Sequence, residues 1–259
     1  MQYGELSFAR VGVDERWTWV SPDEHPCLGL YSGGFVDFFH DDDDGLFYAL
    51  RGDASIYTLD LNSPPNHHPI VVVEKIMAGE LVPPREQPAA MYILRAPWGD
   101  ILQVWRWKRY IDLMEEEETP SSSEELADNL NDDDVDLEPI MGGNDELYPY
   151  LELRTTEIQV FRVDLDQQKL VEISLGEHAL FLGYNATMCL STKDYPVLKP
   201  NCAYITDDSL EYVNNYPNSW REIGIWDMET NQLQSLACAE TSLPWLNCPS
   251  PVWIKPSLC

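Results

Sequence analysis

The residues best suited to chemistry are acids and histidines, and their spacing matches no catalytic or metal-binding motif. His40–Gly45, HDDDDG, is as acidic as a calcium loop. It lacks the alternating ligands and closing glutamate of an EF-hand, so we interpret it as an acidic hairpin turn. His67 and His68 are adjacent in the loop PPNHHP and could bind zinc, but no second ligand pair stands nearby in the sequence. His178 precedes a predicted strand and is interpreted as a turn residue, not a base.

Catalysis is not predicted, because the sequence contains no nucleophile or phosphate-binding motif. The patterns G-x-S-x-G, G-x-G-x-x-G and the Walker loop do not occur. Carboxylates are plentiful enough to supply a glycosidase-like pair, but nothing distinguishes one pair from another. We therefore predict no enzyme activity, no cofactor, and no catalytic, cofactor-binding or metal-binding residues. Protein-binding residues are not identified by the sequence.

The tryptophans are the other side chains with functional potential. Trp17/Trp19 and Trp105/Trp107 are i,i+2 pairs, which places each pair on one face of a strand. Our preferred interpretation is packing between sheets, and the alternative is an exposed aromatic platform for a partner. Trp98, in the turn APWGD, is predicted to be the most exposed of the nine tryptophans.

These residues lie on short apolar runs separated by turn-forming residues, which is typical of an all-β protein. The middle of the chain contains four predicted strands, Met91–Arg95, Ile101–Trp107, Ile158–Asp164 and Lys169–Ile173. A first group is predicted at Leu6–Val11, Trp17–Val20, Gly45–Leu50 and Ser55–Leu61. A third comprises Ala179–Leu182, Thr187–Ser191, Ala203–Thr206, Ile223–Asp227 and the return strand Gln232–Leu236. Antiparallel strands in groups of four predict propeller blades, and an irregular sandwich is the alternative.

A weak internal repeat supports this grouping. Asp60, Asp164 and Asp227 each follow a short apolar run, with apolar residues four before, one before and one after the aspartate. The intervals are 104 and 63 residues, from 164 − 60 and 227 − 164, and the first contains an acidic insertion. We expect each aspartate at a strand end entering a hairpin turn.

Several segments carry a family resemblance: Leu6–Val20, Gly45–Leu61, Gly99–Arg106, Ile158–Asp208, Ile223–Asn231 and Pro249–Leu258. The most specific block is LKPNCAYITDD, within the fourth of them. Through these segments the sequence resembles the plant F-box-associated KIB-type β-propeller family. The resemblance implies one partial propeller domain over residues 1–259, an incomplete ring of antiparallel four-stranded blades. It also implies a target-selecting role, while a Skp1-type adaptor is not an expected partner because no F-box precedes the propeller.

Charge and cysteine usage restrict the environment and the partners. The net charge of −29 disfavours nucleic acid and anionic membranes as partners. Residues 113–147 form an acidic insertion that we expect to be disordered, and Ser121–Ser123 within it lie next to acids, a setting suited to phosphorylation. No membrane span or signal peptide is predicted, and the six cysteines are expected to be free thiols. We therefore expect a cytoplasmic and/or nuclear protein.

The sequence thus favours a non-catalytic protein-interaction module with a protein partner whose identity the sequence does not give. The alternatives are a carbohydrate-directed propeller enzyme or lectin, and a truncated product without independent function. The acidic insertion is interpreted as a solvated loop, and the alternative is a docking segment for a basic partner.

Overall fold

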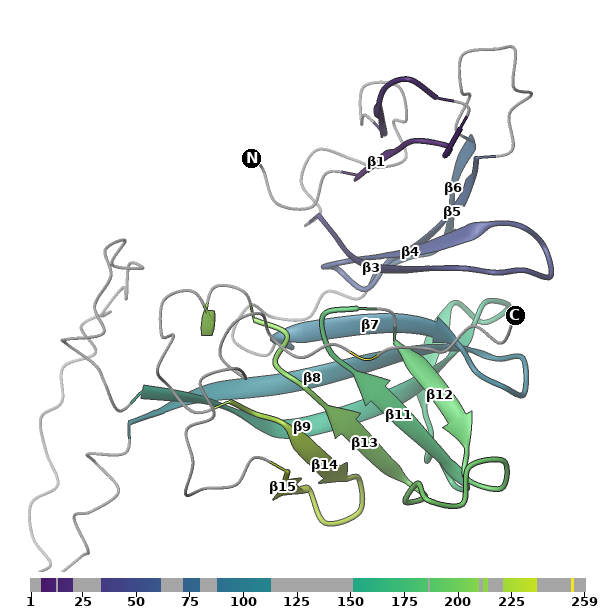
Figure 1. Ribbon diagram of the computed structural model, residues 1–259. Helices are drawn as coiled ribbons and strands as arrows, with labels where there is room; N and C mark the ends of the chain where they lie inside the picture. The colour runs from purple at the N-terminus through teal and green to yellow at the C-terminus, as the bar shows by residue number, and fades with distance from the viewer. Residues whose placement is uncertain are drawn as a thin grey trace, which may run out of the picture.

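The computed structural model places most of the chain in β-sheets (Figure 1). It describes residues 6–12, 14–20, 34–61, 72–79, 88–112, 151–185, 187–209, 212–213, 221–236 and 253. The acidic insertion, His67, His68 and four of the six cysteines lie outside these residues. Predictions about their structure therefore stay predictions.

The first large sheet is antiparallel and has the order β3-β4-β5-β6. Its strands are β3 (Phe35–His40), β4 (Phe47–Arg51), β5 (Ile56–Asp60) and β6 (Val72–Met77). β4 and β5 are buried along most of their length, while β3 and β6 at the two edges alternate or are largely exposed.

The first predicted group was partly wrong. β1 (Leu6–Phe8) and β2 (Thr18–Val20) pair with each other in a separate two-stranded sheet. β3 and β6, which the sequence pattern did not predict, complete the four-stranded sheet instead. β3 follows a glycine pair and runs into the acidic turn, and exposed charged residues interrupt β6, so neither has the compact apolar pattern of a central strand.

The second sheet agrees with the prediction and has the order β10-β9-β8-β7, all antiparallel. Its strands are β7 (Ala90–Arg95), β8 (Ile101–Asp112), β9 (Leu151–Asp164) and β10 (Lys169–Glu172). β7 pairs with β8 only as far as Arg106, whereas β8 and β9 stay paired to Asp112 and Leu151. Beyond a register shift at Trp107/Lys108, β8 and β9 therefore continue as a two-stranded arm (Figure 1).

The third sheet has five strands in the order β12-β11-β13-β14-β15. They are β11 (His178–Leu182), β12 (Met188–Ser191), β13 (Cys202–Ile205), β14 (Gly224–Asp227) and β15 (Gln232–Ser235). β11 and β13 are parallel, and the other pairs are antiparallel. All five strands correspond to predicted segments. The expectation of an antiparallel four-stranded group was wrong here, because the sheet has five strands and the β11–β13 pair is parallel. Within the described residues the sheets do not close a ring.

The three aspartates of the predicted repeat occupy equivalent positions. Asp60, Asp164 and Asp227 are the last residues of β5, β9 and β14, each the penultimate strand of its sheet. Asp164 and Asp227 accept backbone N–H groups of their turns, and Gln168 and Asn231, each four residues on, both have φ near 50°. Asn tolerates this left-handed conformation better than most residues. The predicted strand-end position is confirmed for all three aspartates and the turn for Asp164 and Asp227, while the turn after Asp60 lies outside the described residues.

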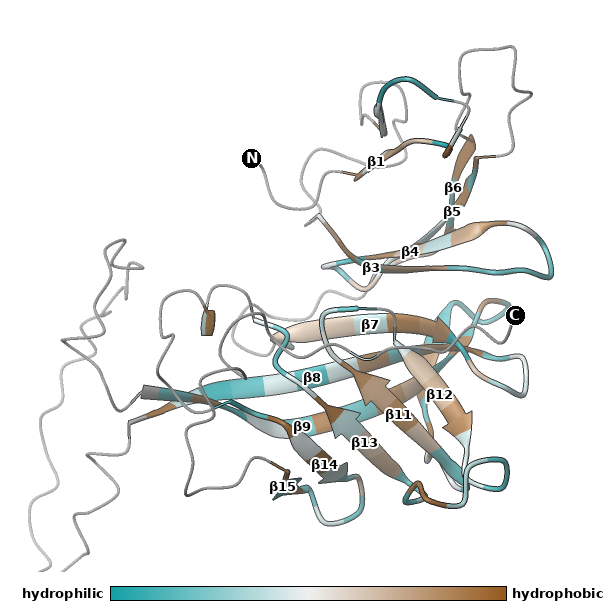
Figure 2. Ribbon diagram, viewed as in Figure 1, coloured by the Kyte–Doolittle hydropathy of each residue, from teal (hydrophilic) through white to brown (hydrophobic). Residues whose placement is uncertain are grey.

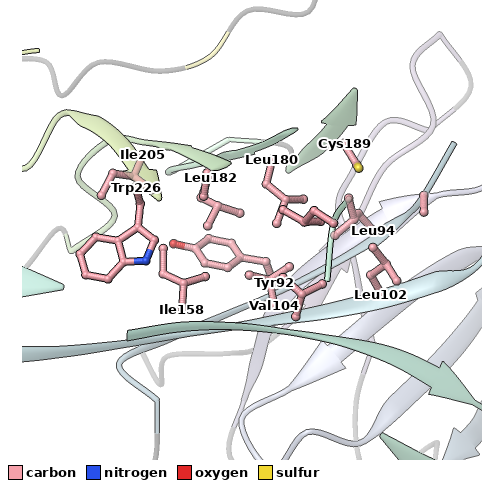
Figure 3. Packing of buried hydrophobic residues seen from close by; sticks show 14 residues of the cluster. Tyr92, Leu94, Leu102, Val104, Ile158, Leu180, Leu182, Cys189, Ile205 and Trp226 are labelled. Carbon is pink, nitrogen blue, oxygen red and sulfur yellow. The ribbon is translucent and has the colours of Figure 1, made fainter. Parts of the chain in front are cut away.

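The residue before each aspartate faces the preceding sheet, as the repeat predicts. Three apolar clusters fill the spaces between successive sheets, and each contains one of these residues, namely Leu59, Val163 and Trp226. Figure 2 shows apolar residues on the strands that border these spaces, including β7 and β11. The largest cluster lies between the second and third sheets, where Tyr92, Ile158 and Trp226 approach one another (Figure 3). Burial between sheets is thus the main apolar contribution to stability.

Candidate functional site

The strongest concentration of buried charge lies between the second and third sheets, around Arg106 of β8. This side chain is fully buried. Its guanidinium donates to Thr155 Oγ1 at 2.8 Å, to the Thr206 carbonyl oxygen at 3.0 Å and to Asp208 Oδ2 at 2.9 Å. It also donates to Glu222 Oε2 at 2.6 Å. Alternation along β8 directs this arginine toward the third sheet, so it connects β8 and β9 to the segments after β13 and before β14.

A second buried cation completes this ionic cluster. Lys108, two residues along β8, forms an ion pair with Asp208. Burial, followed by the neighbouring Arg106 charge, lowers the pKa of Lys108 well below its ordinary value. Glu222 also accepts the backbone N–H of Thr155 at 2.7 Å. Two cations thus face two carboxylates with their hydrogen bonds largely made, an arrangement that fixes the relative position of the sheets.

One carboxylate connects the first and second sheets. Asp37 of β3 accepts the backbone N–H of Ile93 in β7 at 2.8 Å. Burial raises the pKa of Asp37 to about 6, against the lowering effect of this hydrogen bond. β3 and β7 lie side by side, so a single side chain serves as a polar contact between neighbouring sheets.

A groove of about 660 Å³ separates the β8–β9 arm from β14 and β15. Arg109 and Arg154 line it from the arm, and Trp226, Gln232 and Leu233 line it from the opposite side. Figure 2 shows hydrophilic residues on the part of β8 beyond β7, where the arm begins. The buried Glu222, which is paired with Arg106, also lines the groove. The groove therefore combines an apolar floor with polar and charged walls, and its exposed charge is cationic.

The cations of this groove are unusual in so acidic a chain. Arg109 and Arg154 are directly opposite in the β8–β9 register, a placement in which like charges repel. Arg154 is paired with Glu152 at 2.7 Å, whereas the exposed Arg109 forms no ion pair with any carboxylate of the described residues. The buried indole Nε1 of Trp226 also has no hydrogen-bond partner within the described part of the chain. The exposed guanidinium of Arg109 is thus a donor in the groove that can accept a carboxylate as its partner.

The tryptophan pairs divide between the two interpretations. Trp105 is buried and Trp107 packs against the same cluster, as the packing interpretation requires. Trp17 and Trp19 are 68% and 56% exposed, so packing between sheets is wrong for this pair. Trp98 is exposed as predicted, at 41%, but it is less exposed than Trp17 and Trp19.

The exposure of Trp19 follows from the pairing of β1 with β2, and Trp17 immediately precedes β2. Val20 of β2 is buried against the first large sheet, and alternation directs Trp19 to the opposite face. Trp19 is opposite Ser7, a small polar residue that covers little of the indole. The sequence contained this pair, but its exposure depends on which face of the small sheet packs inward.

The histidine and acidic-turn predictions have separate outcomes. His40–Gly45 forms the end of β3 and a hairpin turn into β4, as predicted. Asp41 of this turn is buried and pairs with Arg95 of β7, so it contributes to contact between sheets. His178 is the first residue of β11, where its ring lies 4.5 Å from that of Trp98. Its backbone N–H also donates to the Leu175 carbonyl oxygen at 3.1 Å, so His178 closes the turn that leads into β11, as predicted.

Cys189 and Cys202 are buried free thiols, as expected. Burial raises the pKa of Cys189 to about 12. In the described ranges no group of three or more His, Cys, Asp or Glu side chains could hold a metal ion. The same residues include no helix long and apolar enough to cross a membrane.

Comparison with known families decides the relationship of this chain. A family model described as the KIB1-4 beta-propeller matches residues 1–227, which is most of the 259 residues. The chain belongs to the KIB1-4 β-propeller family. The sheets of this KIB1-4 propeller, packed face to face with an aspartate repeat, agree with this assignment. No curated protein and no solved structure matches the chain.

Proposed function

We propose that this KIB1-4 propeller is a non-catalytic protein-interaction module that binds a protein partner through the exposed face of the β1–β2 sheet. Membership of a propeller family is compatible with such a role. The observation that carries the proposal is the exposure of two large indoles two residues apart, Trp19 on β2 and Trp17 immediately before that strand. Tryptophans dominate the energetics of protein interfaces, and single exposed aromatics are less informative than adjacent pairs.

Burial of the two indoles against a partner would supply enough free energy for specific binding. Covering two indoles removes on the order of 300 Å² of apolar surface from water, which corresponds to roughly 7 kcal/mol before the costs of association. The net charge of −29 supports a protein rather than nucleic acid as the partner. The buried free thiols Cys189 and Cys202 suit a reducing compartment, so we place the interaction in the cytoplasm and/or nucleus.

The non-catalytic part of the proposal rests on the charged residues. Arg106, Lys108, Asp208 and Glu222 are buried and satisfy one another, which leaves them little capacity to act on a substrate. Their exposed fractions are all at or below 5%. A carbohydrate-directed activity would need two accessible carboxylates facing a common cleft.

The test is quantitative affinity purification from plant extract with the wild type, the W17A/W19A variant and a W98A control. Trp98 is also exposed but lies on the turn between β7 and β8. We expect a partner whose purified form binds the wild type and W98A equally and binds W17A/W19A at least about tenfold more weakly. A partner that binds W17A/W19A as tightly as it binds the wild type would exclude this surface as the binding site. Turnover of aryl glycosides by the purified wild type would exclude the non-catalytic assignment.

A further inference from the structure

The groove between the β8–β9 arm and β14–β15 lies beside the ends of an acidic segment of the same chain. Asp112 and Leu151 are the last paired residues of the arm. Residues 113–150 connect them, and Ile111, two residues before the segment starts, lines the groove. Arg109 is three residues from Asp112, about 10 Å along a strand. Both ends of the segment are therefore fixed close to the groove.

The charges of the segment and of the groove are complementary. Residues 113–147 contain fourteen Asp and Glu and no Lys, Arg or His. Arg109 faces the groove without an ion-pair partner among the described residues, although the chain has 45 acids for 16 bases. The segment also carries leucines suited to the apolar floor formed by Ile111, Trp226 and Leu233. Among the described residues Arg109 has no carboxylate partner, and a carboxylate oxygen is the acceptor that best suits a guanidinium.

Tethering favours this segment over an acidic partner from solution. Two short connections hold the segment at a millimolar effective concentration beside the groove. An acidic peptide in solution is repelled by the net charge of −29, and the tethered segment would compete with it. The same attachment disfavours a second copy of the chain, which carries the same net charge.

We propose that the acidic segment 113–147 binds in cis in this groove, with its carboxylates paired to Arg109. This surface is separate from Trp17 and Trp19, and the inference goes beyond the proposed function and does not depend on it. Glu152 already offsets the charge of Arg154, so the carboxylates of the segment would reduce the repulsion between the two arginines by pairing with Arg109.

The test uses the full chain carrying R109K, which preserves the positive charge and supplies an amine for carbodiimide coupling. The carbodiimide joins the Nζ of the introduced lysine to a contacting carboxylate as an amide, and it takes up the water that is released. The matched control is R162K, on β9 outside the groove, where Arg162 is also exposed and faces Asp164 at 3.9 Å. Mass spectrometry of proteolytic fragments identifies the coupled acids in the monomer fraction.

We expect R109K to couple within one chain to acids of 113–147 at least about tenfold more than R162K does, because of the high local concentration. Raising the salt concentration should reduce this difference, since the contact is ionic and partly exposed. Equal coupling by R109K and R162K would overturn the proposal. Coupling of R109K between chains, in a cross-linked dimer, would also overturn it and identify a second copy as the occupant.

A second variant distinguishes binding from proximity. Replacing 113–147 with an uncharged Gly/Ser linker of equal length leaves the groove unchanged, and the synthetic peptide 113–147 is then added in solution. We expect the peptide to bind this linker variant. Binding should be lost when the linker variant also carries the R109E substitution. A peptide that binds equally with and without R109E would contradict the assigned site.

Discussion

Replacing Arg106 with methionine removes the guanidinium at the centre of the buried ionic cluster and keeps a side chain of similar length. Four acceptors lose a donor at once: Thr155 Oγ1, the Thr206 carbonyl oxygen, Asp208 and Glu222. Lys108 still pairs with Asp208, so the principal loss is at Glu222. Glu222 keeps its two bonds to Thr155 but becomes a buried carboxylate without a cation.

The expected cost follows from this uncompensated charge. Breaking a buried ion pair by removing one partner typically costs about 3–5 kcal/mol, because the remaining ion has lost both water and its counter-charge. A domain has about 5–15 kcal/mol of stability in total, so R106M should lose a large fraction of it. The double variant R106M/E222L should be more stable than R106M, since it removes the carboxylate that R106M leaves unpaired.

Urea denaturation monitored by tryptophan fluorescence measures these differences, with R154M as the control. Arg154 also pairs with a glutamate, but it is 38% exposed, and such surface pairs contribute about 0–1 kcal/mol. Hydrogen exchange should show the loss of protection in R106M at β8 and near Thr206 and Glu222. If the free energy of unfolding of R106M is within about 1 kcal/mol of that of R154M, the buried ionic cluster does not hold the second and third sheets together.

Three further predictions concern other contacts. The folded pKa of Asp37, about 6, lies above its ordinary value of 3.8, so its contribution to stability is present at low pH and is lost as the pH rises through about 6. D37N should therefore gain stability relative to the wild type between pH 4 and pH 7 in urea titrations, and a constant difference would contradict this. G224A should lose about 1–3 kcal/mol, because a Cβ there would lie 2.5 Å from the Gln234 carbonyl oxygen, whereas a Cβ at Gly99 meets no atom within 4 Å. A melting temperature of G224A equal to that of the wild type would disprove the steric overlap between the added Cβ and the Gln234 carbonyl oxygen. Cys189 should resist iodoacetamide in the native protein and react in denaturant, as mapped by mass spectrometry, since burial raises its pKa to about 12. Rapid native alkylation at Cys189 would show that β12 opens.

The sequence predicted the parts of the fold that depend on local pattern. The aspartate positions were found because an Asp recurs with apolar residues four before, one before and one after it, the pattern of a strand end. β3 and β6 were missed because edge strands have less burial and a weaker apolar pattern. The parallel pairing of β11 with β13 depends on packing between distant elements, which local periodicity does not encode.

The groove could not be found from the sequence, although its residues were present. Arg109 and Arg154 are separated by the acidic segment and meet only through the β8–β9 register. That register includes a shift at Trp107/Lys108, which moves every later residue by one position relative to a regular ladder. Without the shift, alternation alone would assign the wrong side chains to the groove face.

The long pairing of β8 with β9 also has a kinetic consequence. These strands form the central pair of the second sheet, yet residues 113–150 must be closed into a loop before they can meet. Loop closure delays contacts that are distant in sequence, and each doubling of loop length costs only about 0.6 kcal/mol at equilibrium. Shortening the connection to a tight turn should therefore accelerate folding of this sheet much more than it stabilises the folded protein. The position of the insertion thus determines the order in which the strands of the second sheet pair: β7 and β8 pair early, and β9 joins them late.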